Sequence, residues 1–100
     1  MDLDVHHKLR VQVYLGSDMA AARIEVRGSV TPRNVVALYV ITRRTNAFAP
    51  GMEVLLDLSR ARVDASVLDE LFRAARNQQL PAGVDPSPAP CCLRILEPAS

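Results

Sequence analysis

The sequence predicts an α/β fold, a mixed β-sheet with α-helices packed on it. Two short segments, residues 9–15 and 22–26, alternate apolar and polar side chains as half-exposed strands do. A continuous apolar run at residues 54–58 is typical of a strand covered on both faces, and residues 65–77 repeat apolar side chains at helical spacing. Together these features predict an N-terminal antiparallel hairpin, then a parallel β-α-β-α unit and a final strand.

The N-terminal part of the chain supplies the hairpin. Residues 1–7 read as a flexible arm, and a turn at residues 16–18 joins the two strands, the second of which we expect to end at Gly28. His6 and His7 lie in the arm beside Asp4. We expect a solvated tail there rather than a metal site, because the spacing fixes no third ligand.

The segment that follows is ambiguous between strand and helix. Residues 35–42 are rich in β-branched side chains, which favours a strand. Thr31 and Pro32, however, are typical of an N-cap followed by proline at the first helical position. The length of the segment up to Pro50 and its polar ends also favour a helix, which we expect to be largely covered because its apolar face is wide.

The segment 53–77 predicts a buried strand, a polar turn at residues 59–62 and a helix capped by Asp64. Ser66 then lies in the first helical turn, where the positive end of the helix favours anionic groups. Asp57 falls inside the apolar run, and we expect its carboxylate to accept backbone amides of neighbouring loops. We can nominate no second polarised group that would make Asp57 catalytic.

The last part of the chain is a proline-rich loop at residues 80–90 and a final strand at residues 92–96. Adjacent Cys91 and Cys92 lack the further Cys or His of a metal site, so we interpret them as small hydrophobic residues. With 100 residues and 49% hydrophobic content, we expect a single domain, residues 1–100, around one core.

Composition excludes several classes of function. A net charge of +1 gives no strong field for nucleic acid or an anionic membrane. No segment is long enough for a membrane span, and the N-terminus lacks the pattern of a signal peptide, so we expect a cytoplasmic protein. There is no phosphate-binding glycine loop, nucleophile elbow or metal motif, so we expect no cofactor, no metal and no enzymatic activity.

The order and spacing of these elements resemble the STAS family, which includes domains of sulphate transporters and anti-sigma factor antagonists. That family carries a strand ending in Asp-Leu-Ser and then Asp-Ser-Ser-Gly at a helix start, and here the matching residues are 57–59 and 64–67. Ser66 matches the serine that a partner kinase phosphorylates in family regulators, whereas Ala65 and Val67 replace the first Ser and the Gly. Residues 26–31 replace the family's Gly-Glu-Leu-Asp, and the resemblance covers roughly residues 8–79.

The resemblance implies an anti-sigma factor antagonist. It would bind a kinase-like anti-sigma factor while unmodified and be released when Ser66 is phosphorylated. The remaining partner-binding residues that we expect at the same edge of the sheet are Ser29, Thr31, Arg60, Arg62, Asp64 and Asp69.

Three alternatives stay open at this stage. From the residues alone, the favoured interpretation of Ser66 is a solvent-facing hydroxyl of a first helical turn, because serine is common at that position. STAS-like domains also serve as non-phosphorylated scaffold subunits of transport or stress-signalling complexes. A homodimer also stays open among the partners. An enzyme or ligand-binding domain would require a polar pocket that the sequence does not indicate.

Overall fold

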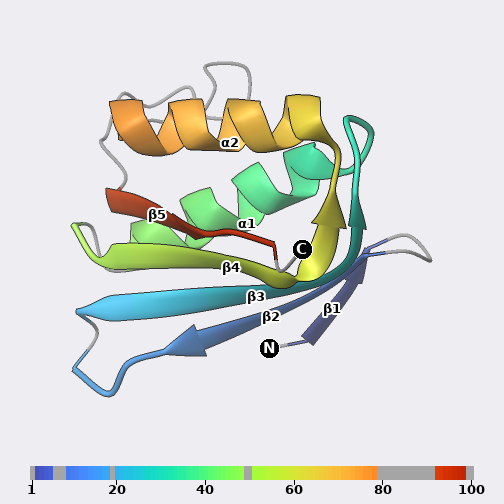
Figure 1. Ribbon diagram of the computed structural model, residues 1–100. Coiled ribbons are helices and arrows are strands. Elements are labelled where there is room, and N and C mark those ends of the chain that lie inside the picture. The colour runs from blue at the N-terminus through green and yellow to red at the C-terminus, as the bar shows by residue number, and fades with distance from the viewer. Residues whose placement is uncertain (1, 6–8, 19, 49–50, 79–91, 99–100) are drawn as a thin grey trace.

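The computed structural model describes residues 2–5, 9–18, 20–48, 51–78 and 92–98, and side chains from Leu9 onward. These residues form one five-stranded sheet, in the order β1-β2-β3-β4-β5, and two helices (Figure 1). The elements along the chain are β1 (Asp2–Val5), β2 (Leu9–Leu15), β3 (Ala21–Val30), α1 (Val35–Phe48), β4 (Glu53–Val63), α2 (Ala65–Asn77) and β5 (Cys92–Leu96).

The sheet is mixed, as predicted. Strands β1, β2 and β3 pair antiparallel, which confirms the hairpin, whereas β3, β4 and β5 pair in parallel. Strand β4 therefore lies between two parallel neighbours, and helices follow both β3 and β4 in the chain. The carboxyl ends of β3 and β4 meet at one edge of the sheet, which is where loops of such folds commonly bind partners.

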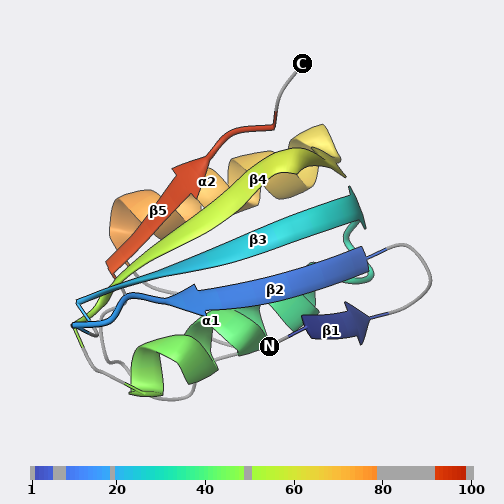
Figure 2. The same cartoon turned by 90° about the horizontal axis from the view of Figure 1, so that it is seen from below.

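Both helices pack on one face of the sheet. Figure 2 shows the opposite face, which no described helix covers. We call it the open face. Apolar side chains on the covered face alternate along the strands and meet the buried side of each helix. Together they form the hydrophobic core, whose fully buried residues include Val11, Ile24, Val26, Val54, Leu56 and Leu58 on the strands and Leu38 and Leu71 on the helices.

A β-bulge lets β3 and β4 run further than the sequence predicts. The register advances two residues on β3, from Glu25 to Arg27, while β4 advances three, from Asp57 to Arg60. The extra residue shifts the buried positions of β4 from even to odd numbers, so that Ala61 returns to the core. The prediction of a polar turn at residues 59–62 is therefore wrong, because these residues continue β4.

Two further predictions about the strands are wrong. Gly28 does not end β3, because its left-handed φ of 98° is accommodated inside the strand, which continues to Val30. Residues 2–5 of the predicted flexible arm form β1, since their backbone finds partners along β2. His6, His7, Cys91 and the predicted loop at residues 80–90 lie outside the described residues.

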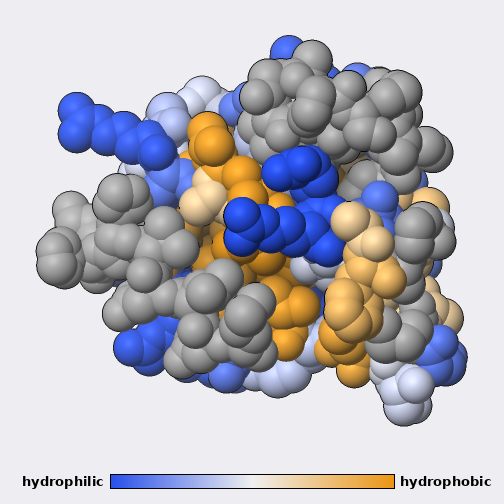
Figure 3. All heavy atoms as spheres, turned by 180° about the vertical axis from the view of Figure 1, so that it is seen from behind, coloured by the Kyte–Doolittle hydropathy of each residue, from blue (hydrophilic) through white to orange (hydrophobic). Residues whose placement is uncertain are grey.

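Helix α1 confirms the choice of helix over strand for residues 35–42. It begins at Val35 and not at Pro32, because Thr31 first closes a separate turn by accepting the amides of Asn34 and Val35 at 3.1 and 3.0 Å. The helix is less covered than expected, since Val36 is 51% exposed and Phe48 68%. Figure 3, which views the molecule from behind relative to Figure 1, shows apolar residues at the surface.

Helix α2 has the predicted bounds of residues 65–77. Val67, Leu71 and Ala74 are its buried residues, spaced at three and four positions, and they place one face on the sheet. The helix ends at Gln78, whose left-handed backbone lets its amide donate to the carbonyls of Ala74 and Ala75.

Candidate functional site

The candidate site lies where β3 and β4 end and α2 begins. Val30 and Val63, the last residues of the two strands, are register partners. The amide of Asp64 donates a 3.2 Å hydrogen bond to the carbonyl of Val30, and the carbonyl of Asp64 accepts the amide of Leu68 at 2.9 Å. The start of α2 is thus held by the sheet on one side and by the first helical bond on the other.

Ser66 is the second residue of α2 and its side chain is exposed. Asp64 occupies the N-cap position with an extended backbone (φ −57°, ψ 141°), but its side chain makes no capping hydrogen bond. Asp64 is at the predicted N-cap position, but the prediction that its carboxylate binds the helix amides is wrong, because the exposed side chain makes no such hydrogen bond. The first-turn amides keep their capacity to bind an anionic group near Ser66.

Ser29, Thr31 and Arg62 lie at the same edge. Ser29 on β3 and Arg62 on β4 are register partners, and Thr31 follows directly after β3. The Thr31 hydroxyl accepts the amide of Arg33 at 3.2 Å, which fixes the turn before α1. Arg62 is exposed and Ser29 is half-buried. The sheet therefore brings Ser29, Thr31, Arg62, Asp64 and Ser66 to one edge.

Two of the predicted residues lie further away. Arg60 is two positions before Arg62 along β4, opposite Arg27, and its exposed side chain belongs to the open face. Asp69 is one turn further along α2 and pairs with Arg73 at 3.7 Å, with the two side chains 72% and 66% exposed. Pairs as exposed as this one contribute little stability, so the structure assigns Asp69 no role in holding the edge together.

Asn34 also belongs to this edge, although the sequence alone does not single it out. Its side-chain oxygen accepts the amide of Thr31 at 2.8 Å, and its side-chain nitrogen donates to the carbonyl of Ser29 at 2.9 Å. The residue is only 7% exposed, so a single buried amide side chain fixes the path of the chain out of β3. The signal available in the sequence was an Asn two residues after a Pro, which is typical of turns.

Asp57 is a structural carboxylate rather than a reactive one. Its Oδ1 accepts from the hydroxyl and the amide of Ser59 at 2.6 and 3.0 Å, and Arg23 approaches Oδ2 at 3.5 Å. Burial raises the pKa of Asp57, but the two Ser59 hydrogen bonds and the charges of Arg23 and Arg60 outweigh it, so the pKa is lowered. The bonds come from its own strand, not from neighbouring loops as predicted.

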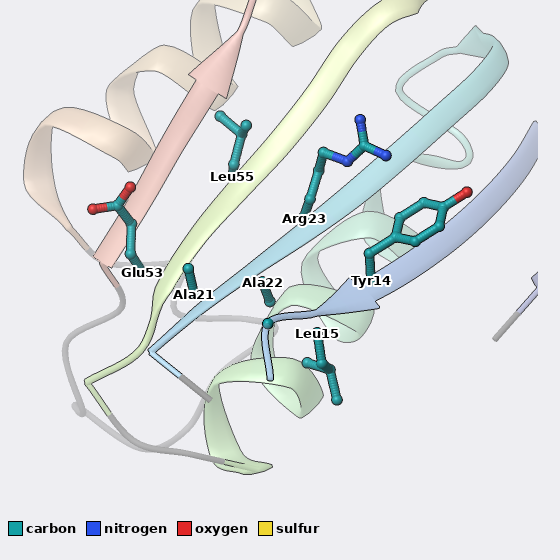
Figure 4. A pocket seen from close by; sticks show the side chains of 8 residues that line it. Tyr14, Leu15, Ala21, Ala22, Arg23, Glu53 and Leu55 are labelled. Atoms are coloured by element: carbon teal, nitrogen blue, oxygen red, sulfur yellow. The ribbon is translucent and has the colours of Figure 1, made fainter. Parts of the chain in front are cut away.

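A hollow of about 350 Å³ lies at the opposite end of the strands (Figure 4). Its charged lining residues are Arg23 and Glu53. The guanidinium of Arg23 lies over the Tyr14 ring, 4.6 Å from the centroid, and pairs with Glu25 and Asp57. None of the predicted site residues lines it; its lining residues are Tyr14, Leu15, Gly16, Ala21, Ala22, Arg23, Glu53 and Leu55. Within the described residues, no three His, Cys, Asp or Glu side chains could together hold a metal ion.

Comparison with known proteins identifies the fold. The solved structure of an antisigma-factor antagonist, a STAS domain from Rhodobacter sphaeroides, superposes with a TM-score of 0.55. It is 21% identical in sequence, and the match covers 92% of this chain and 89% of that one. No protein-family model and no curated protein matches the sequence. The chain has a STAS-like fold, as its mixed sheet and one-sided helices indicate.

Neither helix in the described part of the chain is long and apolar enough to cross a membrane.

Proposed function

We propose that this protein is a regulatory protein–protein interaction module, an anti-sigma factor antagonist that changes partner when Ser66 is phosphorylated. A solved protein of the same fold is described as an antisigma-factor antagonist, which supports this class of function. The proposed activity is binding and not catalysis, in the cytoplasm and without a cofactor. The partner is an anti-sigma factor of the serine-kinase type.

The observation that carries the proposal is the position of the Ser66 hydroxyl. It is exposed in the first turn of a helix whose start is fixed to the sheet by the Asp64–Val30 hydrogen bond. An exposed hydroxyl on a rigid element can enter a kinase active site without unfolding the domain. Because no side chain of Asp64 occupies the first-turn amides, a phosphate on Ser66 can use them.

The charge of the phosphate is what would change the partner. Phosphorylation adds about 1.5 to 2 negative charges beside the exposed carboxylate of Asp64. A partner that packs closely against the unmodified hydroxyl would have to desolvate this charge, so it would be released. The surface that we assign to the partner contains Ser29, Thr31, Arg60, Arg62, Asp64, Ser66 and Asp69.

The proposal is tested by the modification state of Ser66 in the native host. The endogenous protein is purified under several growth conditions and its peptides are analysed by mass spectrometry. We expect phosphate on Ser66 in at least one condition and an anti-sigma factor that co-purifies with the unmodified form. Half-buried Ser29, at the same edge, serves as the internal control and should stay unmodified. Ser66 unmodified under all conditions would contradict the proposal.

A second candidate function is a non-phosphorylated scaffold subunit of a transport or stress-signalling complex. It is favoured by Ala65 and Val67, which stand where the resembled motif has Ser and Gly, and by the sheet face that no described helix covers. This function predicts stable co-purification with other subunits in a ratio that does not change with growth condition. The same purification distinguishes the two functions, and sedimentation of the purified protein reports whether it forms a homodimer.

A further inference from the structure

The open face carries a cluster of arginines that only the strand register reveals. Arg10 on β2 is the partner of Arg27 on β3, and Arg27 is the partner of Arg60 on β4. Arg62 follows two positions later on β4, so it projects from the same face. We call Arg10, Arg27, Arg60 and Arg62 the arginine cluster. All four side chains are exposed.

This arrangement leaves positive charge that the sheet itself does not neutralise. Like charges directly opposite on neighbouring strands are destabilising. Arg27 is bound to Glu25 at 3.1 Å. Arg60 and Arg62, in contrast, make no direct hydrogen bond or ion pair with any side chain that the structure describes, although the charge of Arg60 acts at longer range on the buried carboxylate of Asp57. The donors of both exposed guanidinium groups can therefore bind an external anion.

We propose that the arginine cluster docks a carboxylate-rich segment of a partner protein. Each guanidinium offers a planar fork of donors that matches a carboxylate, and neighbouring forks on adjacent strands bind several carboxylates of one segment. The cluster shares Arg60 and Arg62 with the partner surface proposed above but extends across the open face to Arg27 and Arg10. Docking there requires no phosphorylation of Ser66, so it goes beyond the switch proposed above.

The surroundings of the cluster favour a protein over a nucleic acid. The next row on the face holds the carboxylates Glu25 and Asp57 in place of further arginines, so the positive charge does not continue along the face as a phosphate backbone would require. A peptide can place its acidic side chains on the arginines and neutral ones on that row. Single-stranded nucleic acid also requires aromatic rings for stacking. Tyr14 is the aromatic residue that this face offers among the described residues, and Arg23 already covers its ring.

A second copy of this chain is a poorer occupant. Self-association through the open face would require acceptors for the arginines of the other copy. Glu25 and Asp57 are only 8% and 5% exposed, and both are already bound by arginines of their own sheet. The cluster would therefore meet few free carboxylates on its copy, and the complementary charge must come from a different protein.

The test uses a short fluorescein-labelled peptide of alternating Glu and Ala, with fluorescence anisotropy as the readout. The variant combines Arg60→Gln with Arg62→Gln, and the matched control combines Arg44→Gln with Arg76→Gln, two exposed arginines of α1 and α2. Both doubles lose the same net charge. We expect the first to bind about tenfold more weakly than wild type and the control to change by less than about twofold.

Three outcomes would overturn the proposal. The first is equal weakening in the two doubles, which would indicate a general charge effect. The second is tighter binding of a single-stranded oligonucleotide of the same charge to the same cluster, which would assign the wrong class of partner. The third, independent of variant folding, is an NMR titration of wild type in which the peptide shifts no amide signals around Arg60 and Arg62. Ser66→Ala should bind the peptide like wild type, which separates this surface from the proposed switch.

Discussion

The amide of Asp64 donates to the carbonyl of Val30, joining the residue before α2 to the last residue of β3 across a distance of 3.2 Å. This bond continues the ladder between β3 and β4 one step beyond the register pair of Val30 and Val63. The start of α2 thereby becomes part of the sheet edge. Ser66, two residues later, is presented on a rigid element although its side chain makes no described contact of its own.

The buried amide of Asn34 should be necessary for the geometry of this edge. Asn34→Ala removes the acceptor of the Thr31 amide and the donor to the Ser29 carbonyl. Because the site is buried, we expect a loss of about 1–3 kcal/mol in the free energy of unfolding, measured by urea denaturation. Asn77→Ala, an exposed Asn at the end of α2, is the control and should change stability by less than about 0.5 kcal/mol. Equal stability of the two variants would contradict the role of Asn34.

Leu56 tests the position of β4 in the centre of the fold. It is 1% exposed, and an unpaired charge there would cost several kcal/mol of a total stability of only about 5–15 kcal/mol. Leu56→Asp should therefore abolish cooperative unfolding in circular dichroism. Leu55→Asp is the control, because Leu55 lies on the open face between the register partners Arg23 and Arg94 and should fold. A folded Leu56→Asp with an unchanged melting curve would show that β4 is not buried.

The lowered pKa of Asp57 predicts a pH dependence of stability. A carboxyl whose folded pKa lies below its unfolded value of about 3.9 stabilises the protein above that pH, and loses the effect as pH falls through the folded pKa. Asp57→Asn should lower the free energy of unfolding at pH 7 by about 1–3 kcal/mol, because it weakens the hydrogen bonds from Ser59 and removes the charge that faces Arg23.

Urea denaturation at a series of pH values checks this prediction. The gap between wild type and Asp57→Asn should shrink below about pH 4. Asp69→Asn, whose carboxylate is 72% exposed, should leave stability almost unchanged at every pH. A gap for Asp57→Asn that stays constant with pH would show that the charge of Asp57 contributes nothing.

The sequence predicts the elements whose signals are local and misses what depends on pairing. Helix α2 is predicted with its bounds because apolar spacing and a polar residue before it act within a few residues. The sequence predicts a turn at the end of β4 because the bulge shifts the alternation of buried and exposed residues there. Without the register with β3, such a shift cannot be told from the end of a strand. The sequence does not predict strand β1 for a similar reason, since its four residues gain strand geometry only through pairing with β2.

The same contrast between local sequence signals and strand pairing applies to the candidate site. The gathering of Ser29, Arg62 and Ser66 could be predicted because parallel strands end at one edge of the sheet. The arginine cluster could not, because Arg10, Arg27 and Arg60 are far apart in the sequence and become neighbours only through the register of three strands.

Ser66 should be neutral for folding if its role lies in binding. Ser66→Ala should change the free energy of unfolding by less than about 0.5 kcal/mol, since Ala is a good helix former and the exposed hydroxyl has no described partner. Ser66→Glu should fold and gain about 0.3–1 kcal/mol, because a negative charge in the first turn interacts favourably with the helix dipole. Loss of folding in either variant would assign Ser66 a structural role that the geometry does not indicate.

The most direct test of the account is the affinity of Ser66 variants for the anti-sigma factor that co-purifies with the native protein, measured by titration calorimetry. Wild type in its unmodified form and Ser66→Ala should bind with similar affinity. Ser66→Glu and protein phosphorylated at Ser66 should bind about 2–5 kcal/mol more weakly, because the new charge must be desolvated in the interface. Equal affinity of all four forms would contradict the central claim that the charge state of Ser66 selects the partner.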